Sequence, residues 1–256
     1  MPRELRVIAL PGIPEVKQDD PLIDLIVAAT ASADLTLQPG DILVLAQKII
    51  SKAEGRVVPL ASITPTTRAQ SIAQEANKDP RIVELILRES NKVLRVKPGI
   101  IIVEHKLGFV MANAGIDQSN VPGAEDAVLL LPQDPDASAR KLRGELHERT
   151  GVHIGVLIID SFGRAWRHGV TGTAIGVAGM PALIDLRGNH DREGRVLKVT
   201  QVAAADELAA AASLVMGQAD EGTPAVLVRG FPYAFDPRRE GSVQELLRNE
   251  AEDLFR

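Results

Sequence analysis

The stretch VHIGVLIIDSFGRAWRHG, residues 152–169, decides the fold class, because the most apolar run of the chain leads directly into a dense group of charged residues. Its first part, 152–160, is largely apolar at consecutive positions, which is typical of a strand covered on both faces. Further strands are predicted at the short apolar runs 5–10, 41–46, 99–103, 109–112, 174–180, 197–202 and 225–229. Helical patterns separate these runs, and this alternation predicts an α/β fold.

Helices are expected where capping residues precede apolar residues at helical spacing. The predicted helices begin after Asp20-Pro21 and Asp79-Pro80, at Asp136 (ending at Gly151), at the alanine-rich run 203–217, and after the capping box of Ser242 and Glu245, with the last one ending near Arg256. The segment 131–137 is rich in Pro and Asp and is the expected boundary between sub-regions of the chain. We expect one domain, 1–256, rather than two independent ones.

Composition narrows the class of protein. The 256 residues are 45% apolar and 25% charged, which is the balance of a globular protein that stays in water. The net charge of −5 argues against a nucleic-acid partner. No apolar run approaches the roughly 18 residues of a membrane helix, and no leader is visible at the N-terminus. Absence of cysteine excludes thiol nucleophiles and cysteine-held metals. A cytoplasmic enzyme or binding protein is expected, without a membrane partner.

Common catalytic signatures are absent from the sequence. It has no Walker phosphate loop, no G-x-G-x-x-G, no G-x-S-x-G elbow and no H-E-x-x-H zinc helix. The candidate residues therefore have to be sought where α/β folds bind ligands, in the segments that follow strands.

Three segments after predicted strands are candidates for binding phosphate or metal. Segment 12–20 has a stiff Pro-Gly-Ile-Pro turn, although it would also suit a plain strand-to-helix connection. Lys48 and Lys52 are four residues apart, so on a helix they share one face and could hold a polyphosphate. Asp117 and Asn120 offer oxygen ligands that suit Mg²⁺. A solvated basic face and an Asx-rich turn are the alternatives for these last two segments.

The end of the 152–160 run carries the densest group of candidates. Asp160 and Ser161 suit a metal ion, whereas Arg164 and Arg167 suit phosphate or carboxylate oxygens. We expect this charge to be buried around one loop, which is unfavourable unless a ligand or metal pairs with it. A structural cluster of salt bridges is the alternative, and His168 is as compatible with a hydrogen-bonded structural role as with catalysis. The segment 216–223, judged on its pattern alone, is a helix C-cap followed by a polar loop.

Taken together, these segments favour phosphoryl transfer. Carboxylates for metal and cations for phosphate, without an activated nucleophile, are the groups that such transfer needs. The residues alone leave kinase, ligase and phosphohydrolase open.

The sequence also resembles a known family, the coenzyme F-420-0:L-glutamate ligases, or γ-glutamyl ligases of F-420 biosynthesis. The resemblance rests on GDILVLAQKIISKAEGR (40–56), HKLGFVMANAGIDQSN (105–120), IIDSFGRAWRHGVTGTAIGVAG (158–179) and MGQADEGTPAVLVRG (216–230), which follow the family's order along nearly the whole chain. It implies an uncommon fold of mixed sheets with flanking helices, and an intertwined homodimer. It also implies that GTP and a divalent metal serve to join L-glutamate to F-420-0 through an acyl phosphate, with a second glutamate added through a γ-linkage.

The resemblance assigns roles to individual residues. The residues implied at GTP are Ile13, Pro14, Glu15, Val16, Gln47, Lys48, Lys52, Asn120, Met216, Gly217, Gln218, Ala219, Asp220, Glu221, Gly222 and Thr223. Asp117 and Asp160 are implied to hold one divalent ion, Mg²⁺ or Mn²⁺, and Ser161 with Gln218 a second. Family members are also reported to use K⁺. Arg164, Arg167 and His168 are the expected catalytic residues.

Two further expectations concern the limits of the resemblance. Some relatives carry a C-terminal flavin-binding reductase domain, which we expect to be absent because the sequence ends at Arg256. The alternatives to a GTP-dependent ligase are another nucleotide-dependent phosphoryl-transfer enzyme or acid–amino-acid ligase on the same scaffold, and a nucleotide-binding regulator without activity. Guanine preference rests on the resemblance alone, because the sequence has no N-K-x-D motif.

Overall fold

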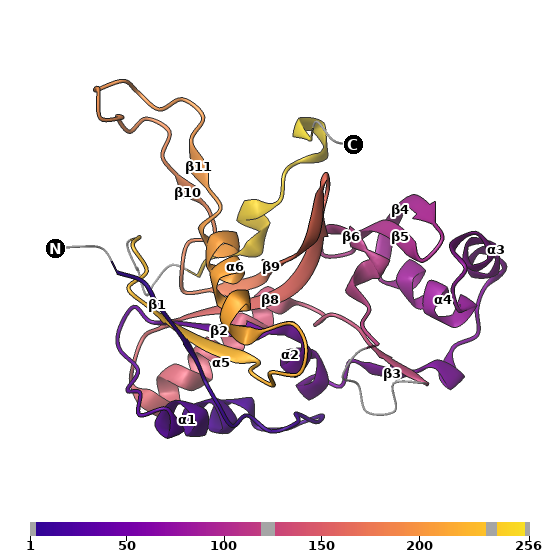
Figure 1. Ribbon diagram of the computed structural model, residues 1–256, viewed down its shortest axis with the longest axis horizontal. Coiled ribbons are helices and arrows are strands. Elements are labelled where there is room, and N and C mark those ends of the chain that lie inside the picture. Colours follow the sequence, from indigo (N-terminus) through magenta and orange to yellow (C-terminus); the bar gives the residue numbers. More distant parts are fainter. Residues whose placement is uncertain (1–3, 119–125, 234–239, 254–256) are drawn as a thin grey trace.

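The computed structural model describes residues 4–118, 126–233 and 240–253, arranged as a large lobe and a small lobe (Figure 1). The large lobe is built on a five-stranded sheet. Its order is β1 (Arg6–Ala9), β12 (Ala225–Arg229), β2 (Ile42–Ala46), β8 (Gly155–Arg164) and β9 (Arg167–Ala178). Strands β2 and β8 are parallel, and the other neighbours are antiparallel.

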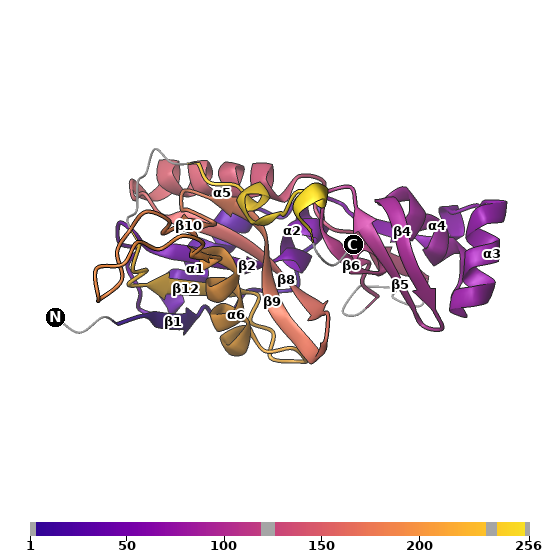
Figure 2. The same ribbon diagram turned by 90° about the horizontal axis from the view of Figure 1, so that it is seen from above.

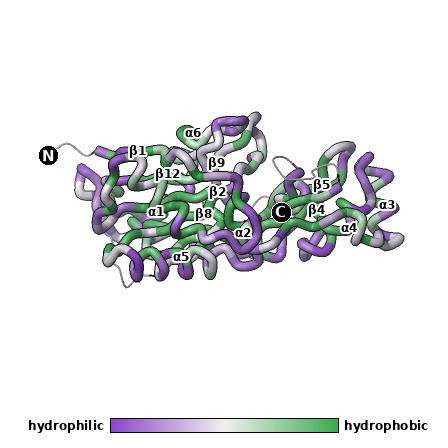
Figure 3. The backbone as a smooth tube through the Cα atoms, turned by 90° about the horizontal axis from the view of Figure 1, so that it is seen from below, coloured by the Kyte–Doolittle hydropathy of each residue, from purple (hydrophilic) through white to green (hydrophobic). Residues whose placement is uncertain are grey.

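Helices cover both faces of this sheet. Helix α5 (Pro135–Thr150) lies on one face and α6 (Ala204–Met216) on the other (Figure 2), and α1 (Leu22–Ser32) runs beside α5. Strands β2 and β12 and the first half of β8, residues 155–159, are largely buried and form the hydrophobic middle of the lobe (Figure 3). Consecutive apolar residues therefore mark strands with two covered faces, as the sequence predicts.

A bulge in β9 lets one strand contact both helices closely. The register shifts between the pairs Ile158–Gly176 and Ile159–Ala174, so β9 has one extra residue and its side chains change face. A side chain at Gly172 would clash with the backbone of α6, and one at Gly176 with the backbone of α5. Glycine at these two positions is thus required by close packing.

The small lobe comprises the elements between α2 (Gln47–Ala53) and α5. It contains β4 (Ser90–Lys97), β5 (Ile100–His105) and β6 (Val110–Ala112) as one sheet, β3 (Val57–Pro59) paired with β7 (Ala127–Leu129), and helices α3 (Thr67–Ala76) and α4 (Pro80–Arg88). Short 3₁₀ turns cover Leu60–Ser62 and Asn113–Gly115. Alanines of α3 pack with Val83 and Ile86 of α4 and with Ile101 and Val103 of β5 in a separate core.

An arm leaves the large lobe after β9. Its base is the short pair β10 (Ile184–Asp185) and β11 (Gln201–Val202), and its tip projects away from the body (Figure 1). The predicted strand at 197–202 is therefore wrong in all but its last two residues. In the described part of the chain, no helix combines the length and the apolar character that a membrane crossing requires.

The helix ends differ from the predictions at several caps. Asp79 caps α4 as predicted, with its side chain accepting from the Arg81 N–H. Pro21, however, is itself the N-cap residue of α1, and no side chain caps that helix. Helix α5 is capped by Asp134, whereas Asp136 is buried and accepts from the Val177 N–H and the Ser242 hydroxyl. Asp136 therefore ties β9 to the C-terminal segment and is not a cap.

The C-terminal segment is also less helical than expected. The capping box of Ser242 and Glu245 is present, but it starts only a 3₁₀ turn, Val243–Leu246, with another at Glu250–Glu252. The expected end of this helix near Arg256 lies outside the described residues. The sequence analysis also did not predict α3, β3, β4, β7 and β10.

Candidate functional site

The largest concentration of predicted site residues lies where β2 ends beside the middle of β8. Because these neighbours are parallel, with Ala46 beside Ile159, the segments that follow these two residues lie at the same edge of the sheet's buried part. Helix α2 follows β2 there, and Asp160 and Ser161 continue β8. A cleft of about 690 Å³ opens at this edge between the 13–16 loop, the start of α2 and the 216–224 loop.

The cleft brings together segments that are far apart in the sequence. The predicted residues that line it are Ile13, Pro14, Glu15, Val16, Gln47, Lys48, Lys52, Asp117, Asp160, Ser161, Met216, Gly217, Gln218, Ala219, Asp220, Glu221, Gly222 and Thr223. Asn120 lies outside the described residues. The individual roles of these residues remain predictions.

Both lysines of α2 are paired with carboxylates. Lys48 Nζ lies 2.6 Å from Asp117 Oδ2, and Lys52 Nζ lies 2.5 Å from Glu15 Oε1. The Lys52 side chain is only 7% exposed, and burying an ammonium group is unfavourable unless an anion pairs with it. The two ammonium groups therefore face the cleft with anions already beside them, and an entering phosphate would have to take the place of an anion.

The two carboxylates predicted to bind metal influence each other. The pKa of Asp160 is raised to about 7, chiefly by burial and also by the charge of Asp117, while the Ser161 N–H and Lys48 act in the opposite direction. Two carboxylates that share one nearby lysine, Lys48, form a site that suits an additional cation. In the part of the chain that the structure describes, no three His, Asp or Glu residues gather into a metal cluster. Further ligands would have to be neutral oxygens or the substrate.

Neutral oxygens are available beside this pair. Ser161 follows Asp160 in β8, and its hydroxyl donates to Gln218 Oε1 across a distance of 2.9 Å. Gln218 comes from the loop after α6, so the hydrogen bond joins two walls of the cleft. Hydroxyl and amide oxygens are acceptable ligands for hard cations such as Mg²⁺, although weaker than carboxylates. The donor set of Asp117, Asp160, Ser161 and Gln218 therefore fits a divalent ion.

Beside these groups, α2 carries a buried polar pair. The Ser51 hydroxyl donates to Gln47 Oε1 at 2.7 Å, and the two residues are 0% and 1% exposed. Gln47 Nε2 is buried without a hydrogen-bond partner in the described part of the chain.

The loop after α6 contributes backbone and carboxylate groups to the cleft wall. Gly217 is the C-cap of α6, as its pattern predicts. Glu221 folds back so that its carboxylate accepts from the Ala219 N–H at 2.8 Å, and backbone N–H groups lower its pKa. This loop therefore already binds an anionic group through its backbone.

Other cleft residues gave no signal in the sequence. They are Ala46, Ile49, Ile159, Val170, Ser213 and Pro224. Ser213 illustrates the reason: its hydroxyl accepts from the Gly172 N–H, a contact that depends on how α6 packs on β9. In the sequence, the apolar residues of this set are indistinguishable from ordinary strand and helix residues. Only the tertiary structure places them in the wall of the cleft.

The three residues expected to be catalytic lie apart from the cleft lining. Arg164, Arg167 and His168 form the end of the β8–β9 hairpin and are exposed, and an Arg164 N–H donates to the His168 carbonyl at 3.4 Å. Trp166 at the turn is 90% exposed. The expectation that this charge is buried around one loop is wrong, because the strands continue past the sheet as a projecting hairpin. Asp160 has Asp117 and Lys48, not Arg164, as its charged neighbours.

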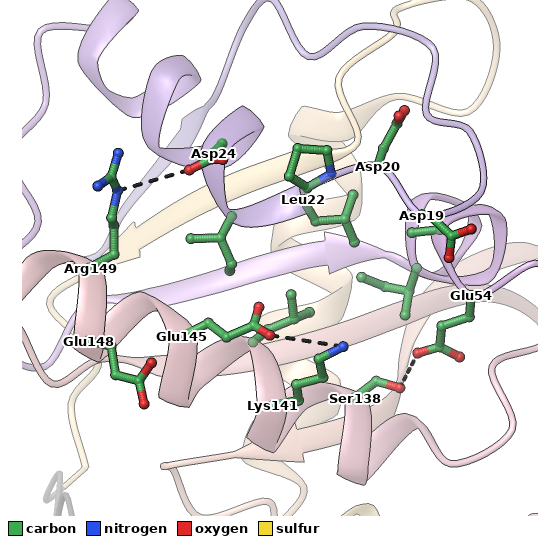
Figure 4. A pocket seen from close by; sticks show the side chains of 15 residues that line it. Asp19, Asp20, Leu22, Asp24, Glu54, Ser138, Lys141, Glu145, Glu148 and Arg149 are labelled. Carbon is green, nitrogen blue, oxygen red and sulfur yellow. Dashed lines mark hydrogen bonds and ion pairs between the residues drawn. The ribbon is translucent and has the colours of Figure 1, made fainter.

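A second hollow, which we call the acidic groove, lies between the start of α1, the end of α2 and α5 (Figure 4). It has a volume of about 640 Å³. Its charged lining residues are Asp19, Asp20, Asp24, Glu54, Glu145, Glu148, Lys141 and Arg149. Figure 4 shows Asp24 directed toward Arg149, and Lys141 toward Glu145, each at 3.9 Å. Asp19 and Asp20 of the candidate segment 12–20 line this groove, but none of the described residues assigned to GTP, metal or catalysis does.

Comparisons with known proteins agree on one family. The sequence profile of the F420-0:Gamma-glutamyl ligase family matches residues 12–230. A protein of Methanothermobacter thermautotrophicus named coenzyme F420:L-glutamate ligase is 47% identical over 252 residues, 98% of this chain and 99% of its own. A protein of the same name from Methanopyrus kandleri is 47% identical over 98% of both chains, and one from Methanocaldococcus jannaschii 45% identical over 88% of both.

Proposed function

Because the chain belongs to the F420-0:gamma-glutamyl ligase family and is thus a ligase of coenzyme F420 biosynthesis, we propose that it uses GTP to join L-glutamate to coenzyme F-420-0. The products are F-420-1 and then γ-linked F-420-2, with GDP and phosphate released, and the reaction takes place in the cytoplasm. One observation carries this proposal. Two lysines and two carboxylates from three separate segments converge in one cleft where β2 ends beside β8.

Lys48 and Lys52 are proposed to bind the phosphates of GTP. Both sit on α2, and the carboxylates that now pair with them come from other segments, Asp117 and Glu15. Phosphate oxygens would replace Glu15 at Lys52, where burial strengthens the interaction of the ammonium group with an anion. The 13–16 loop and the 216–223 loop would then enclose the nucleotide from both sides, with Asn120 also in contact with it.

Asp117 and Asp160 are proposed to hold one divalent ion, and Ser161 with Gln218 a second. Mg²⁺ or Mn²⁺ bound there would offset negative charge on the phosphates during transfer. Asp160 is fixed by its place in β8, directly after the buried part of that strand, whereas Asp117 follows the small-lobe strand β6. Gln218 contributes no charge, so the second site would be the weaker one. The proposal includes K⁺ as a further ion without assigning residues to it.

The chemistry proceeds in two steps. A carboxylate oxygen of F-420-0 attacks the γ-phosphorus, the bond to the GDP oxygen breaks, and an acyl phosphate forms. The amino group of glutamate then attacks the acyl carbon, loses a proton, and expels phosphate. Arg164, Arg167 and His168 are proposed to bind the acidic groups of F-420-0 or the acyl phosphate. The guanidinium groups of the two arginines can each donate two hydrogen bonds to one carboxylate or phosphate group.

An intertwined homodimer is part of the proposal. The β8–β9 hairpin projects beyond the sheet and exposes apolar side chains, with Trp166 90% and Val170 54% exposed, and Leu214 of α6 86% exposed. Exposed apolar residues in such number are typical of a surface that another chain covers. A partner seated on the hairpin would also bring Arg164 and Arg167 into a more enclosed setting.

The test is a reconstitution. The protein is incubated with F-420-0, GTP, Mn²⁺ and L-glutamate, and products are identified by mass. We expect glutamate adducts together with stoichiometric GDP, and neither when glutamate or Mn²⁺ is omitted. GDP release with a different acyl acceptor, or GTP binding without glutamate-dependent GDP release, would contradict the proposal in favour of another ligase or of a regulator.

A further inference from the structure

Helix α2 presents two polar stripes toward the interior. Lys48 and Lys52 form one, and Gln47 and Ser51, also four residues apart, form the other beside it. Gln47 and Ser51 are almost completely buried, although Gln47 lines the cleft. The Ser51 hydroxyl donates to the oxygen of the Gln47 amide, so that oxygen already has its partner.

The nitrogen of the same amide lacks a partner. Gln47 Nε2 makes no hydrogen bond within the described residues and is shielded from solvent. A buried donor without an acceptor weakens a folded protein, and native structures keep few of them without a reason. Since the residue lies on the wall of the cleft, the missing acceptor is best supplied by the molecule that occupies it.

We infer that Ser51 is a positioning residue for nucleotide binding. Its hydroxyl fixes the Gln47 side chain so that the nitrogen, and not the oxygen, is left to donate to an acceptor oxygen of the bound nucleotide. This inference rests on the proposed function, because it takes the cleft as the nucleotide site. The adjacent Lys48–Lys52 stripe places the acceptor on or next to the phosphates. Ser51 itself touches no ligand.

The experiment is a mutant cycle on the full-length protein. Ser51→Ala, Gln47→Ala and the double variant are compared for GTP affinity by calorimetry, for the KM of GTP and of glutamate, and for melting temperature without ligand. Ser51→Ala should weaken GTP binding about tenfold, the effect of one hydrogen bond, and leave the KM of glutamate unchanged. Gln47→Ala should weaken it at least as much, and the double variant no further.

Two additional variants separate positioning from a general effect on folding. Thr30→Val removes another buried hydroxyl, which donates to the Ile26 carbonyl in α1 away from the cleft, and should leave GTP affinity unchanged. Gln47→Glu keeps the acceptor for Ser51 in nearly the same shape but removes the donor, and should weaken GTP binding as strongly as Gln47→Ala.

The outcomes are distinct. If Ser51→Ala binds GTP normally, or if its effect persists in the Gln47→Ala background, Ser51 does not act through Gln47. This result would overturn the inference and leave the proposed function standing. A wild-type protein that neither binds GTP nor releases GDP would overturn the proposed function and the inference together.

Discussion

The cleft and the acidic groove have almost the same volume, about 690 and 640 Å³, and lie on different sides of α2. They differ in how their charges are arranged. In the cleft, Lys52 is buried and pairs at 2.5 Å, whereas Lys141 in the groove is exposed and pairs at 3.9 Å. Long ion pairs on a surface contribute little to the stability of the fold. A buried charge, in contrast, destabilises the protein strongly if its partner is removed. Size therefore does not distinguish the two hollows, whereas the fixed buried charge does.

The strongest test of this difference is Asp160→Asn. We expect glutamate-dependent GDP release to be abolished, because the variant loses one of two carboxylates proposed to hold the divalent ion, while the fold is retained. Glu145→Gln in the acidic groove makes the same chemical change and should leave GDP release unchanged. Activity is measured with Mn²⁺, and melting temperature without metal. Near-normal ligation by Asp160→Asn would remove this residue from the metal site.

The pH dependence of stability sharpens the same comparison. The pKa of Asp160 is raised to about 7 in the folded protein, so the folded state binds more protons than the unfolded one between about pH 4 and 7. This contribution to the free energy of unfolding is therefore lost as the pH rises through 7. Without metal, Asp160→Asn should be more stable than wild type at pH 8.5, by on the order of 1–2 kcal/mol. Equal stability of both proteins at pH 8.5 would show that the ionised Asp160 carboxylate does not destabilise the fold.

The next largest effect is expected at Lys52. Replacing it with alanine removes one charge-assisted hydrogen bond to phosphate, worth about 1.5–3 kcal/mol, so the KM for GTP should rise roughly 10- to 100-fold. Lys141→Ala in the acidic groove serves as the matched control and should leave the KM unchanged. Both are checked by steady-state kinetics. An increase of similar size in both variants would point to a general electrostatic effect and not to a phosphate site.

A smaller effect is expected at the exposed hairpin. Arg167→Lys keeps the charge but loses the planar guanidinium, so turnover should fall about tenfold with little change in melting temperature. The KM of F-420-0 and the kcat are measured alongside thermal unfolding. A variant that melts much earlier but turns over normally would give this arginine a structural role.

The smallest effect, and the one opposite in sign, is expected for Glu15→Gln. Its carboxylate occupies the position beside Lys52 that we assign to phosphate, so its removal should lower the KM for GTP several-fold. The unliganded protein should become less stable, because buried Lys52 loses its counter-ion. Calorimetric GTP titration and a melting curve test both signs. Weaker GTP binding would instead make Glu15 a direct contact of the nucleotide.

How much the sequence predicts depends on what surrounds each element. Strands β2, β8 and β12 are apolar at consecutive positions because both faces are covered, and they were predicted. Strand β4 was missed because SNKVLRVK is a partly exposed strand rich in charge. The first half of β9, RHGVTGT, was missed for the same reason, since it extends beyond the sheet as a hairpin.

The candidate site shows the same division. The sequence predicts that Asp160 and Lys48 each follow a strand, but only the structure shows that the two strands are parallel neighbours, which brings these residues to one cleft. The exposure of Arg164 could not be foreseen, because it depends on how far β8 and β9 stay paired. The Ser51–Gln47 pair also needed coordinates: its spacing fits any helix, and only the packing around α2 shows that both side chains are buried.

The ion pair between Lys48 and Asp117 joins the two lobes, since the lysine lies on α2 of the large lobe and the aspartate lies in the small lobe. Its side chains are 31% and 24% exposed, so dissolved salt reaches them and weakens their attraction. Backbone amides of the small lobe should therefore exchange with deuterium faster as ionic strength rises, whereas those of β2 and β8 should not. The stiffness of the joint between the lobes becomes a property that the solvent can adjust.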